Sequence, residues 1–218
     1  MFVLPDISVI ITCFNYGKYL ERCLRSIYNQ ELTDRYKYEV IVVDDASKDN
    51  TGHLCNRFIS IYPNLIYIRN DINKGLPQSC NIGLSKSLGR YIVRVDADDY
   101  VARHFLFMLK YTLDKNKNIQ AICCDYTEVD DTERYIDYVD VTKNEIACGI
   151  MYRKNILDEI GWYNEEFEYR EGHELNKRFK QNYVMGHLPM PLYCVRKHDK
   201  NRSKNISSIK KFDKKLKS

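Results

Sequence analysis

The first hundred residues alternate short apolar runs with helix-like segments, and this alternation constrains the possible folds more than any other feature of the sequence. The apolar runs are rich in β-branched residues and span residues 7–13, 38–43, 65–68 and 91–95. Such runs are typical of strands that are covered on both faces of a sheet. Helix-like segments lie between them at about 18–29, 51–61 and 77–88. This βαβαβαβ order predicts an α/β fold with a mostly parallel sheet, flanked by helices that form right-handed crossovers.

The second half of the sequence has a less regular pattern. Helices are expected near residues 102–114, 154–160 and 174–181, and strands near 119–125, 149–152, 183–188 and 192–196. The sequence has no internal repeat and no Gly/Ser-rich linker. We therefore expect a single domain over residues 1–200, followed by a basic segment at 201–218.

Composition and charge argue against several classes of protein. The formal net charge is only +4 and the basic excess lies mostly at the C-terminus, so we expect no nucleic-acid partner. No stretch has the length of a membrane span, and the first residues lack the layout of a secretory signal. The eight cysteines fall mostly within apolar patterns and have no zinc spacing. They indicate buried, reduced thiols in a cytoplasmic protein.

Residues 90–99 read Arg-Tyr-Ile-Val-Arg-Val-Asp-Ala-Asp-Asp, so an apolar strand ends in three carboxylates within four positions. Side chains alternate along a strand, which places Asp96 and Asp98 on one face. Two like charges at such a short distance repel each other unless a cation or a hydrogen-bonding ligand stabilises them. Oxygen ligands suit Mg²⁺ or Mn²⁺, which also takes phosphate oxygens from a substrate. The alternative is a solvated acidic turn after the strand.

Three polar clusters follow the first, second and fourth expected strands, at residues 12–17, 44–45 and 96–99. Because ligands of open α/β sheets bind at the carboxyl ends of strands, we expect these clusters to meet along one edge. Taken singly, each cluster has a purely structural alternative. Residues 44–45 could cap the next helix without contacting a ligand, and residues 15–17 could simply form a turn. Arg94 shares a strand face with Asp96 inside an apolar run. We expect it to form a structural ion pair with a neighbouring carboxylate rather than to act in catalysis.

These clusters belong to a longer pattern. It comprises Ile-Ser-Val-Ile-Ile-Thr-Cys-Phe-Asn-Tyr-Gly-Lys-Tyr-Leu at 7–20, Val-Val-Asp-Asp-Ala-Ser-Lys-Asp-Asn-Thr at 42–51, Asn-Lys-Gly at 73–75, Asn-Ile-Gly at 81–83 and Asp-Ala-Asp-Asp at 96–99. The second half adds Gly-Trp-Tyr-Asn-Glu-Glu-Phe at 161–167, Arg-Glu-Gly-His-Glu-Leu at 170–175, Pro-Leu-Tyr at 191–193 and His198. In this order, the motifs resemble those of family 2 glycosyltransferases.

The resemblance implies a GT-A fold, which is Rossmann-like, with a small additional antiparallel sheet in the C-terminal half. Residues 1–99 would then form a nucleotide-binding half and residues 100–200 an acceptor-side half. The resemblance also implies an inverting transfer of a sugar from a nucleotide-diphosphate donor to a hydroxyl of a cell-surface glycan or its precursor, lipid-linked glycans included. The base rate favours a UDP-sugar, and Mn²⁺ or Mg²⁺ is the implied cofactor.

The same resemblance assigns roles to individual residues. Asp45 would contact the nucleobase, Asp96 the ribose, and Asp98 the metal on the diphosphate. His198 lies where some GT-A enzymes have a C-terminal metal ligand, although a lone histidine is more often structural. The donor-nucleotide site implied in this way comprises Thr12, Phe14, Asn15, Asp44, Asp45, Lys74, Gly75, Asn81, Arg94, Asp96 and Ala97.

One position departs from the family pattern in a way that concerns the chemistry. Gly172 stands where the general base that takes the acceptor proton is often found. Glu171 is the first candidate to replace that base, because it lies beside the gap and ahead of the expected helix. His173 is a rival, because the ordinary pKa of histidine suits proton transfer near neutrality. Glu174 is either a third candidate or an ordinary surface residue of the helix.

The last residues are strongly basic, with ten Lys or Arg against two Asp in residues 196–218. Apolar residues at near-helical spacing leave open a weak amphipathic helix that contacts an anionic membrane at its cytoplasmic face. A solvated or disordered tail is the favoured interpretation. The sequence makes no prediction of the oligomeric state.

Two other functions remain open beside a glycosyltransferase. A nucleotidyltransferase would also use paired aspartates and Mg²⁺, but it would normally have a Gly-rich, basic phosphate loop after the first strand, which residues 12–17 lack. A catalytically impaired nucleotide-sugar-binding module of the same fold is consistent with Gly172.

Overall fold

The apolar runs at the start of the chain form the centre of the sheet. The computed structural model describes residues 4–32 and 36–217. Four strands lie parallel in the order β3-β2-β1-β4: β1 (Ile7–Cys13), β2 (Tyr38–Asp44), β3 (Leu65–Arg69) and β4 (Tyr91–Arg94). Every residue of β1 is buried, as expected for a strand that is covered on both faces. The predicted α/β class and its parallel core are confirmed.

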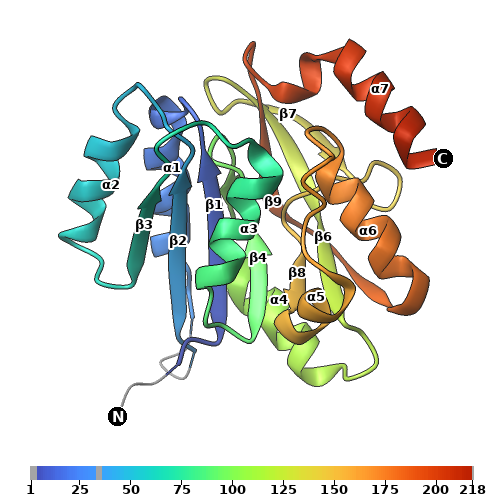
Figure 1. Ribbon diagram of the computed structural model, residues 1–218. Coiled ribbons are helices and arrows are strands. Elements are labelled where there is room, and N and C mark those ends of the chain that lie inside the picture. The colour runs from blue at the N-terminus through green and yellow to red at the C-terminus, as the bar shows by residue number, and fades with distance from the viewer. Residues whose placement is uncertain (1–3, 33–35, 218) are drawn as a thin grey trace.

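Three helices connect these strands: α1 (Gly17–Tyr28), α2 (Thr51–Ile59) and α3 (Leu76–Lys86). In Figure 1, α3 lies in front of β1 and β2, and α1 lies behind the sheet. Gly83 allows the close approach of α3, since a Cβ there would lie 2.6 Å from Cγ2 of Ile10. The helix begins after Gly75, which has a left-handed φ of 88°, and Pro77 occupies its first turn.

The remaining strands extend the same sheet. They are β5 (Tyr100–Val101), β6 (Ala121–Asp130), β7 (Tyr135–Val139), β8 (Met151–Arg153) and β9 (Met185–Lys197). β8 is antiparallel to β4 and β6, β9 is parallel to β6 and antiparallel to β5, and β7 pairs with β6. The antiparallel strands are therefore part of one mixed, nine-stranded sheet within the described residues, rather than a separate small sheet.

The structure corrects two expected boundaries in the second half. The closing strands expected at 183–188 and 192–196 are one strand, β9, whose pairing with β6 shifts register around Asp125. The helices of this half are α4 (Phe105–Lys115), α5 (Lys154–Ile160) and α6 (Glu171–Asn182). α6 begins at residue 171, directly after Arg170, which has a left-handed φ of 64°. Glu171 therefore lies inside the first turn of the helix and not ahead of it.

The basic C-terminal segment is also folded, so the favoured prediction of a solvated or disordered tail is wrong for the described residues. It forms the short helix η1 (Arg202–Lys204) and then α7 (Ile206–Lys217), which lies beside α6 in Figure 1. Phe212 of α7 is buried, with its ring centroid 5.9 Å from that of Phe167 and 6.0 Å from that of Tyr169. A helix here was the alternative left open by the spacing of the apolar residues, but the sequence did not indicate that Phe212 packs against the protein.

The cysteines behave as predicted. All eight are free, and seven of them are buried; Cys194 is partly exposed. Within the part of the chain that the structure describes, no helix combines the length and the apolar character that crossing a bilayer requires.

Candidate functional site

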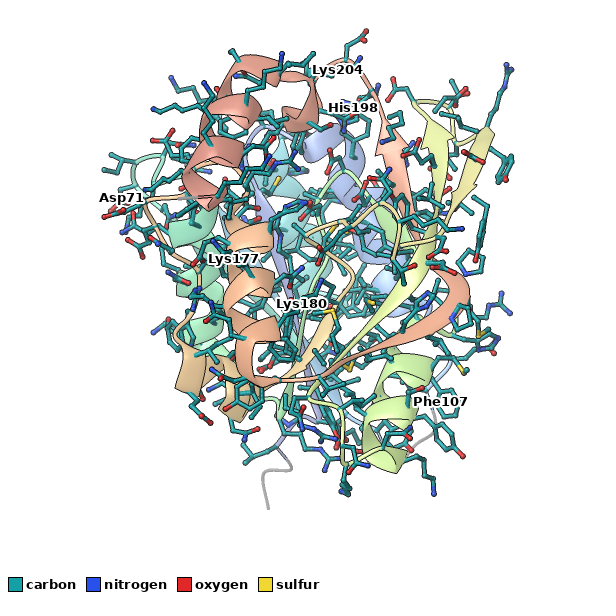
Figure 2. All side chains as sticks on the ribbon, turned by 90° about the vertical axis from the view of Figure 1, so that its right-hand side faces the viewer. Asp71, Phe107, Lys177, Lys180, His198 and Lys204 are labelled. Carbon is teal, nitrogen blue, oxygen red and sulfur yellow. The ribbon has the colours of Figure 1, made fainter. Side chains whose placement is uncertain are left out.

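A cleft of about 800 Å³ opens where β1, β2 and β4 end. The pairing of the strands places Cys13 beside Asp44 and Ile10 beside Arg94, so their carboxyl ends share one edge of the sheet. The opposite wall comes from segments of the second half, at 144–148, 165–173 and 195–203. The two walls of the cleft thus come from parts of the chain that are remote in sequence. In Figure 2, His198 and Lys204 lie at one end of the molecule and Phe107 of α4 at the other.

The cleft brings together most of the predicted donor-site residues. Those that line it are Thr12, Phe14, Asp45, Lys74, Gly75, Arg94, Asp96 and Ala97, together with the predicted metal ligand Asp98. Of the three candidate bases, His173 lines it. The residues that do not line it are Asn15, Asp44, Asn81, Glu171, Glu174 and His198.

The neighbouring residues Asp44 and Asp45 have different surroundings. Asp44 is fully buried and accepts hydrogen bonds from Arg69 Nη1 at 2.6 Å and from the Tyr67 hydroxyl at 2.7 Å. It ties β2 to β3. Asp45 accepts hydrogen bonds from Asn70 and from two backbone N–H groups at the start of α3, at 2.8 and 2.9 Å. It reaches the cleft and fixes the loop beside it.

Asn15 and Asn81 both serve local structure. Asn15 has a left-handed φ of 58°, and its side-chain oxygen accepts a hydrogen bond from the backbone N–H of Lys48 at 2.8 Å. This corresponds to the turn role that asparagine often has. Asn81 donates to the Tyr163 carbonyl at 2.9 Å and accepts from the Tyr163 N–H at 3.0 Å, so it attaches α3 to the loop ahead of α6.

Arg94 forms the predicted ion pair, and it does so with two carboxylates. Its Nε lies 2.7 Å from Asp96 Oδ1 and its Nη1 lies 2.8 Å from Glu171 Oε1. The side chain is only 7% exposed. Burial opposes its charge, but Asp96 and Glu171, with the Cys80 thiol nearby, together raise the pKa of Arg94 well above its usual value. Arg94 thus joins the end of β4 to the start of α6.

The predicted metal ligands Asp98 and His198 lie side by side. His198 Nε2 is 2.9 Å from Asp98 Oδ2, and Asn201 Nδ2 donates to the same oxygen at 3.2 Å. The imidazole is buried and stacks on Tyr19, with ring centroids 4.5 Å apart. A carboxylate oxygen and an imidazole nitrogen are ligands that Mn²⁺ accepts. The residues present therefore fit a divalent cation.

Asp99 lies behind this pair and has a structural role. Its carboxylate accepts hydrogen bonds from the Tyr193 hydroxyl and the Arg196 N–H, both at 2.9 Å. Burial and then the charges of Asp98 and Asp96 raise the pKa of Asp99 well above its usual range. The ligand atoms of Asp96, Asp99 and Cys148 lie within 4.8 Å of one another, but a thiol is a soft ligand that Mg²⁺ and Mn²⁺ disfavour.

The first turn of α6 separates the three candidate bases. Glu171 is buried and paired with Arg94, and Glu174 is paired with Arg178 at 2.6 Å. His173 lines the cleft, with its Nε2 3.3 Å from Arg170 Nη1 and its Nδ1 buried without a hydrogen-bond partner among the described residues. Burial, and then the charge of Arg170, lower the pKa of His173 below the usual 6.5.

Several residues of the cleft were missed by sequence reasoning. They include Tyr16, Glu145, Tyr169, Arg170, Asn201 and Arg202. Asn201 follows three residues after His198, so the predicted metal histidine was the signal that could have found it. Tyr16 lies within the polar cluster predicted at residues 12–17, whereas Glu145, Tyr169, Arg170 and Arg202 reach the cleft through the packing of the irregular second half.

The chain matches the family model described as "Glycosyl transferase family 2" over residues 8–196. It is 34% identical over 128 residues to the glycosyltransferase GlyG of Streptococcus pneumoniae serotype 4, which covers 58% of this chain and 41% of that protein. It is 31% identical over 133 residues to the chondroitin synthase of Escherichia coli, which covers 61% of this chain and 18% of that protein. The chain thus spans less than half the length of these relatives.

Solved structures share the fold at lower identity. TarS 1-349 of S. aureus in complex with UDP-GlcNAc superposes with a TM-score of 0.77 at 22% identity, covering 92% of this chain and 61% of that chain. The mannosyltransferase PcManGT of Pyrobaculum calidifontis, in complex with GDP-Man and Mn²⁺, has a TM-score of 0.72 at 19% identity, with coverages of 91% and 59%. The expected GT-A type of α/β fold is confirmed.

Proposed function

This chain belongs to glycosyl transferase family 2, and from that premise we propose that it transfers a sugar from a nucleotide-diphosphate donor to a hydroxyl group, with inversion at the anomeric carbon. The observation that carries this proposal is the meeting of Asp45, Asp96 and Asp98 along one cleft at the carboxyl ends of parallel strands. Ligands of such sheets bind at this edge. Residues 1–99 then supply the nucleotide-binding half and residues 100–200 the acceptor side.

In the proposed complex the nucleotide lies along the ends of β1, β2 and β4. Asp45 contacts the nucleobase, with Thr12 and Phe14 beside it, and Asp96 contacts the ribose. The hydrogen bonds that Asp45 accepts from the start of α3 support this role, because they hold the carboxylate rigidly at the cleft. A uridine nucleotide is the proposed donor; relatives of the same fold have been solved with UDP-GlcNAc and with GDP-Man.

Asp98 and His198 are the proposed ligands of Mn²⁺ or Mg²⁺. When bound, the cation supplies charge that stabilises the leaving nucleoside diphosphate. His198 is held for this role by its stacking on Tyr19, and Asn201 orients Asp98. The relative PcManGT, solved with GDP-Man and Mn²⁺, supports the use of a cation in this fold.

The acceptor enters from the side of the second half, where residues 144–148 and the first turn of α6 line the cleft. The proposed acceptor is a hydroxyl of a cell-surface glycan or of its precursor, lipid-linked glycans included. Inversion requires a general base that takes the proton of this hydroxyl. Glu171 or His173, at the start of α6, is the proposed source of that base.

Calorimetric titration with UDP, with and without Mn²⁺, tests the donor site. We expect Mn²⁺ to strengthen binding of UDP to the wild type and to have no effect on Asp98→Ala, which lacks the metal carboxylate. Asp137→Ala, which changes an exposed aspartate of β7, is the matched control and should bind like the wild type. Equal Mn²⁺ dependence in Asp98→Ala would contradict the assignment.

Gly172 favours one alternative, a nucleotide-sugar-binding module without transfer activity. Such a module would bind UDP and Mn²⁺ but release no nucleoside diphosphate from a nucleotide-sugar. Donor hydrolysis by the wild type, measured beside Glu171→Gln, distinguishes the two functions, because a module shows no activity that the substitution could reduce.

We also propose that α7 contacts an anionic membrane surface. The lysines at positions 210, 211 and 214 are exposed, whereas Phe212 faces the protein. In Figure 2, Lys177 and Lys180 lie along α6, next to this helix. The contact is therefore electrostatic and peripheral, and α7 does not insert its apolar side.

A further inference from the structure

Position 172 cannot supply a base in this fold. An ideal Cβ on Gly172 would lie 2.3 Å from Ala147 Cβ, 3.0 Å from its Cα and 3.2 Å from its carbonyl oxygen. Real Cβ atoms essentially never have contacts below 3.0 Å, and the Ala147 Cβ at 2.3 Å has no other rotamer that would move it away. Any side chain at this position would have to displace the 144–148 segment that forms the cleft wall. The base must therefore come from another residue.

Three carboxylates of the cleft form ion pairs with Lys or Arg. Asp96 pairs with Arg94, and Glu128 pairs with Lys197 at 2.7 Å. Glu145 pairs with Lys180 at 2.9 Å. A carboxylate that is stabilised by a cation is a weaker proton acceptor. Glu168 lines the cleft without an ion pair among the described residues, but it is exposed to solvent.

His173 also lies beside a cation, Arg170, but the ordinary pKa of an imidazole is closer to neutrality than that of a carboxylate. The Arg170 guanidinium can only donate, so its contact with Nε2 at 3.3 Å places the imidazole lone pair on Nε2 and the proton on the buried Nδ1. Arg170 itself is held by Asp213 of α7, with Nε and Oδ1 2.7 Å apart. Arg170 therefore acts on the ring chiefly as a fixed positive charge. Burial and then Arg170 lower the pKa of His173, although Glu145 and Glu171 oppose this shift, and the net effect favours the neutral ring.

We propose that His173 is the general base of the transfer and that Arg170, held by Asp213, is the residue that positions its imidazole. This inference rests on the proposed function. The acceptor hydroxyl replaces the 3.3 Å contact of Arg170 at Nε2 and gives its proton to this nitrogen while its oxygen forms a bond to the anomeric carbon of the donor. The bond from that carbon to the diphosphate oxygen breaks, and its electron pair leaves with the nucleoside diphosphate. The imidazolium then returns its proton to the solvent.

The first test measures donor hydrolysis, in which water takes the place of the acceptor. A thermal-shift panel of UDP-glucose, UDP-galactose, UDP-GlcNAc and GDP-mannose with Mn²⁺ selects the donor, and release of its nucleoside diphosphate is followed. We expect His173→Gln to lower kcat by about 10²- to 10⁴-fold, the usual contribution of a general base, while the affinity for UDP and Mn²⁺ stays unchanged. His53→Gln, on the exposed side of α2, is the matched control and should keep wild-type activity.

The outcomes separate this inference from the proposed function. Wild-type kcat in His173→Gln, or the same loss in Glu168→Gln instead, would overturn the role of His173 and leave the donor site intact. A wild type that neither binds UDP with Mn²⁺ nor releases nucleotide would overturn the proposed function, and this inference with it.

A second test needs no substrate. Titration of the imidazole resonances by NMR should give His173 a pKa below 6.5, and Arg170→Gln should raise it, because the substitution removes the neighbouring cation. In the active enzyme, the same substitution should move the acidic limb of the kcat/KM profile to higher pH. A His173 that is protonated at pH 7, or that titrates identically in both proteins, would overturn the proposal.

Discussion

At the scale of single residues, burial and partners decide which of several similar side chains can act. Asp44 and Asp45 are adjacent and chemically identical, yet one is tied to Arg69 and the other reaches the cleft. The residues alone predicted the location of the pair, and only the family resemblance singled out Asp45 as the ligand contact. That Asp44 is tied to Arg69 could not be predicted, because Arg69 lies on another strand. The ion pair of Arg94 was predictable, since a charge inside an apolar strand needs a partner. The sequence did not predict that its second partner is Glu171, which lies 77 positions further along the chain.

The ion pairs of Arg94 predict a large effect on stability. Arg94→Met leaves Asp96 and the buried Glu171 without their cation, so the free energy of unfolding should fall by about 3–5 kcal/mol. Urea unfolding measures this value. Arg103→Met removes an exposed pair with Glu31 and should change the same quantity by only about 0–1 kcal/mol. A loss in Arg94→Met no larger than in this control would mean that the buried pairs contribute little.

At the scale of elements, the start of α6 depends on a contact that no periodic pattern reveals. The sequence predicted the helix from residue 174, because polar residues precede the first apolar position. The structure starts it at residue 171, where Gly172 lies against Ala147 and Arg170 takes a left-handed conformation. Three more residues thus enter the helix, and they include two of the candidate bases.

Gly172→Ala tests that contact. In an exposed helix, alanine in place of glycine stabilises by about 1 kcal/mol, but here the added methyl would overlap Ala147. We expect a net destabilisation of about 1–3 kcal/mol, as for overpacked cores, measured by urea unfolding. The double variant Gly172→Ala with Ala147→Gly removes one of the overlapping atoms and should recover part of the loss. If Gly172→Ala alone stabilises the protein, the 144–148 segment moves easily to make room for the added methyl group.

The proposed membrane contact of α7 predicts a dependence on charge. Each lysine near an anionic surface contributes about 1 kcal/mol, so charge reversal of Lys210, Lys211 and Lys214 to Glu should weaken sedimentation with phosphatidylserine vesicles by at least about 10²-fold. Reversal of Lys115 and Lys117, at the end of α4, is the matched control and should have little effect. Equally poor sedimentation of the full chain and of a chain truncated at Ser207 would refute the contact.

At the scale of the whole molecule, the first half was predictable and the second was not, for a physical reason. β1 to β4 are joined by local crossovers, so their order follows from the alternation of strands and helices and from the handedness of βαβ units. The pairings of β6 with β9 and of β4 with β8 connect segments about 60 residues apart. Nothing in either segment specifies its partner. The sequence therefore predicted the edge of the cleft at the ends of β1, β2 and β4, whereas the opposite wall could be identified only from the structure.

Thiol reactivity should report on the whole fold. Burial raises the pKa of Cys55 and of Cys80 to about 12 and that of Cys123 to about 11, so these thiols stay protonated and shielded at pH 8. We expect the native protein to react slowly with Ellman's reagent, chiefly at the partly exposed Cys194, and all eight thiols to react in urea. Cys194→Ser should remove the slow native reaction. Rapid labelling of several thiols in the native protein would contradict the buried arrangement.

The ion pair between Arg170 and Asp213 has a practical consequence for handling this protein. Through this ion pair, α7 holds Arg170, which contacts the imidazole of His173, the proposed base, about forty positions before Asp213 in the chain. A tag or reporter fused directly behind α7 is attached to the helix that holds Arg170, so we expect it to change the activity if it disturbs this ion pair. The amino end of β1 lies at the opposite end of the sheet from the cleft, so we expect a fusion on that side to leave the ion pair undisturbed.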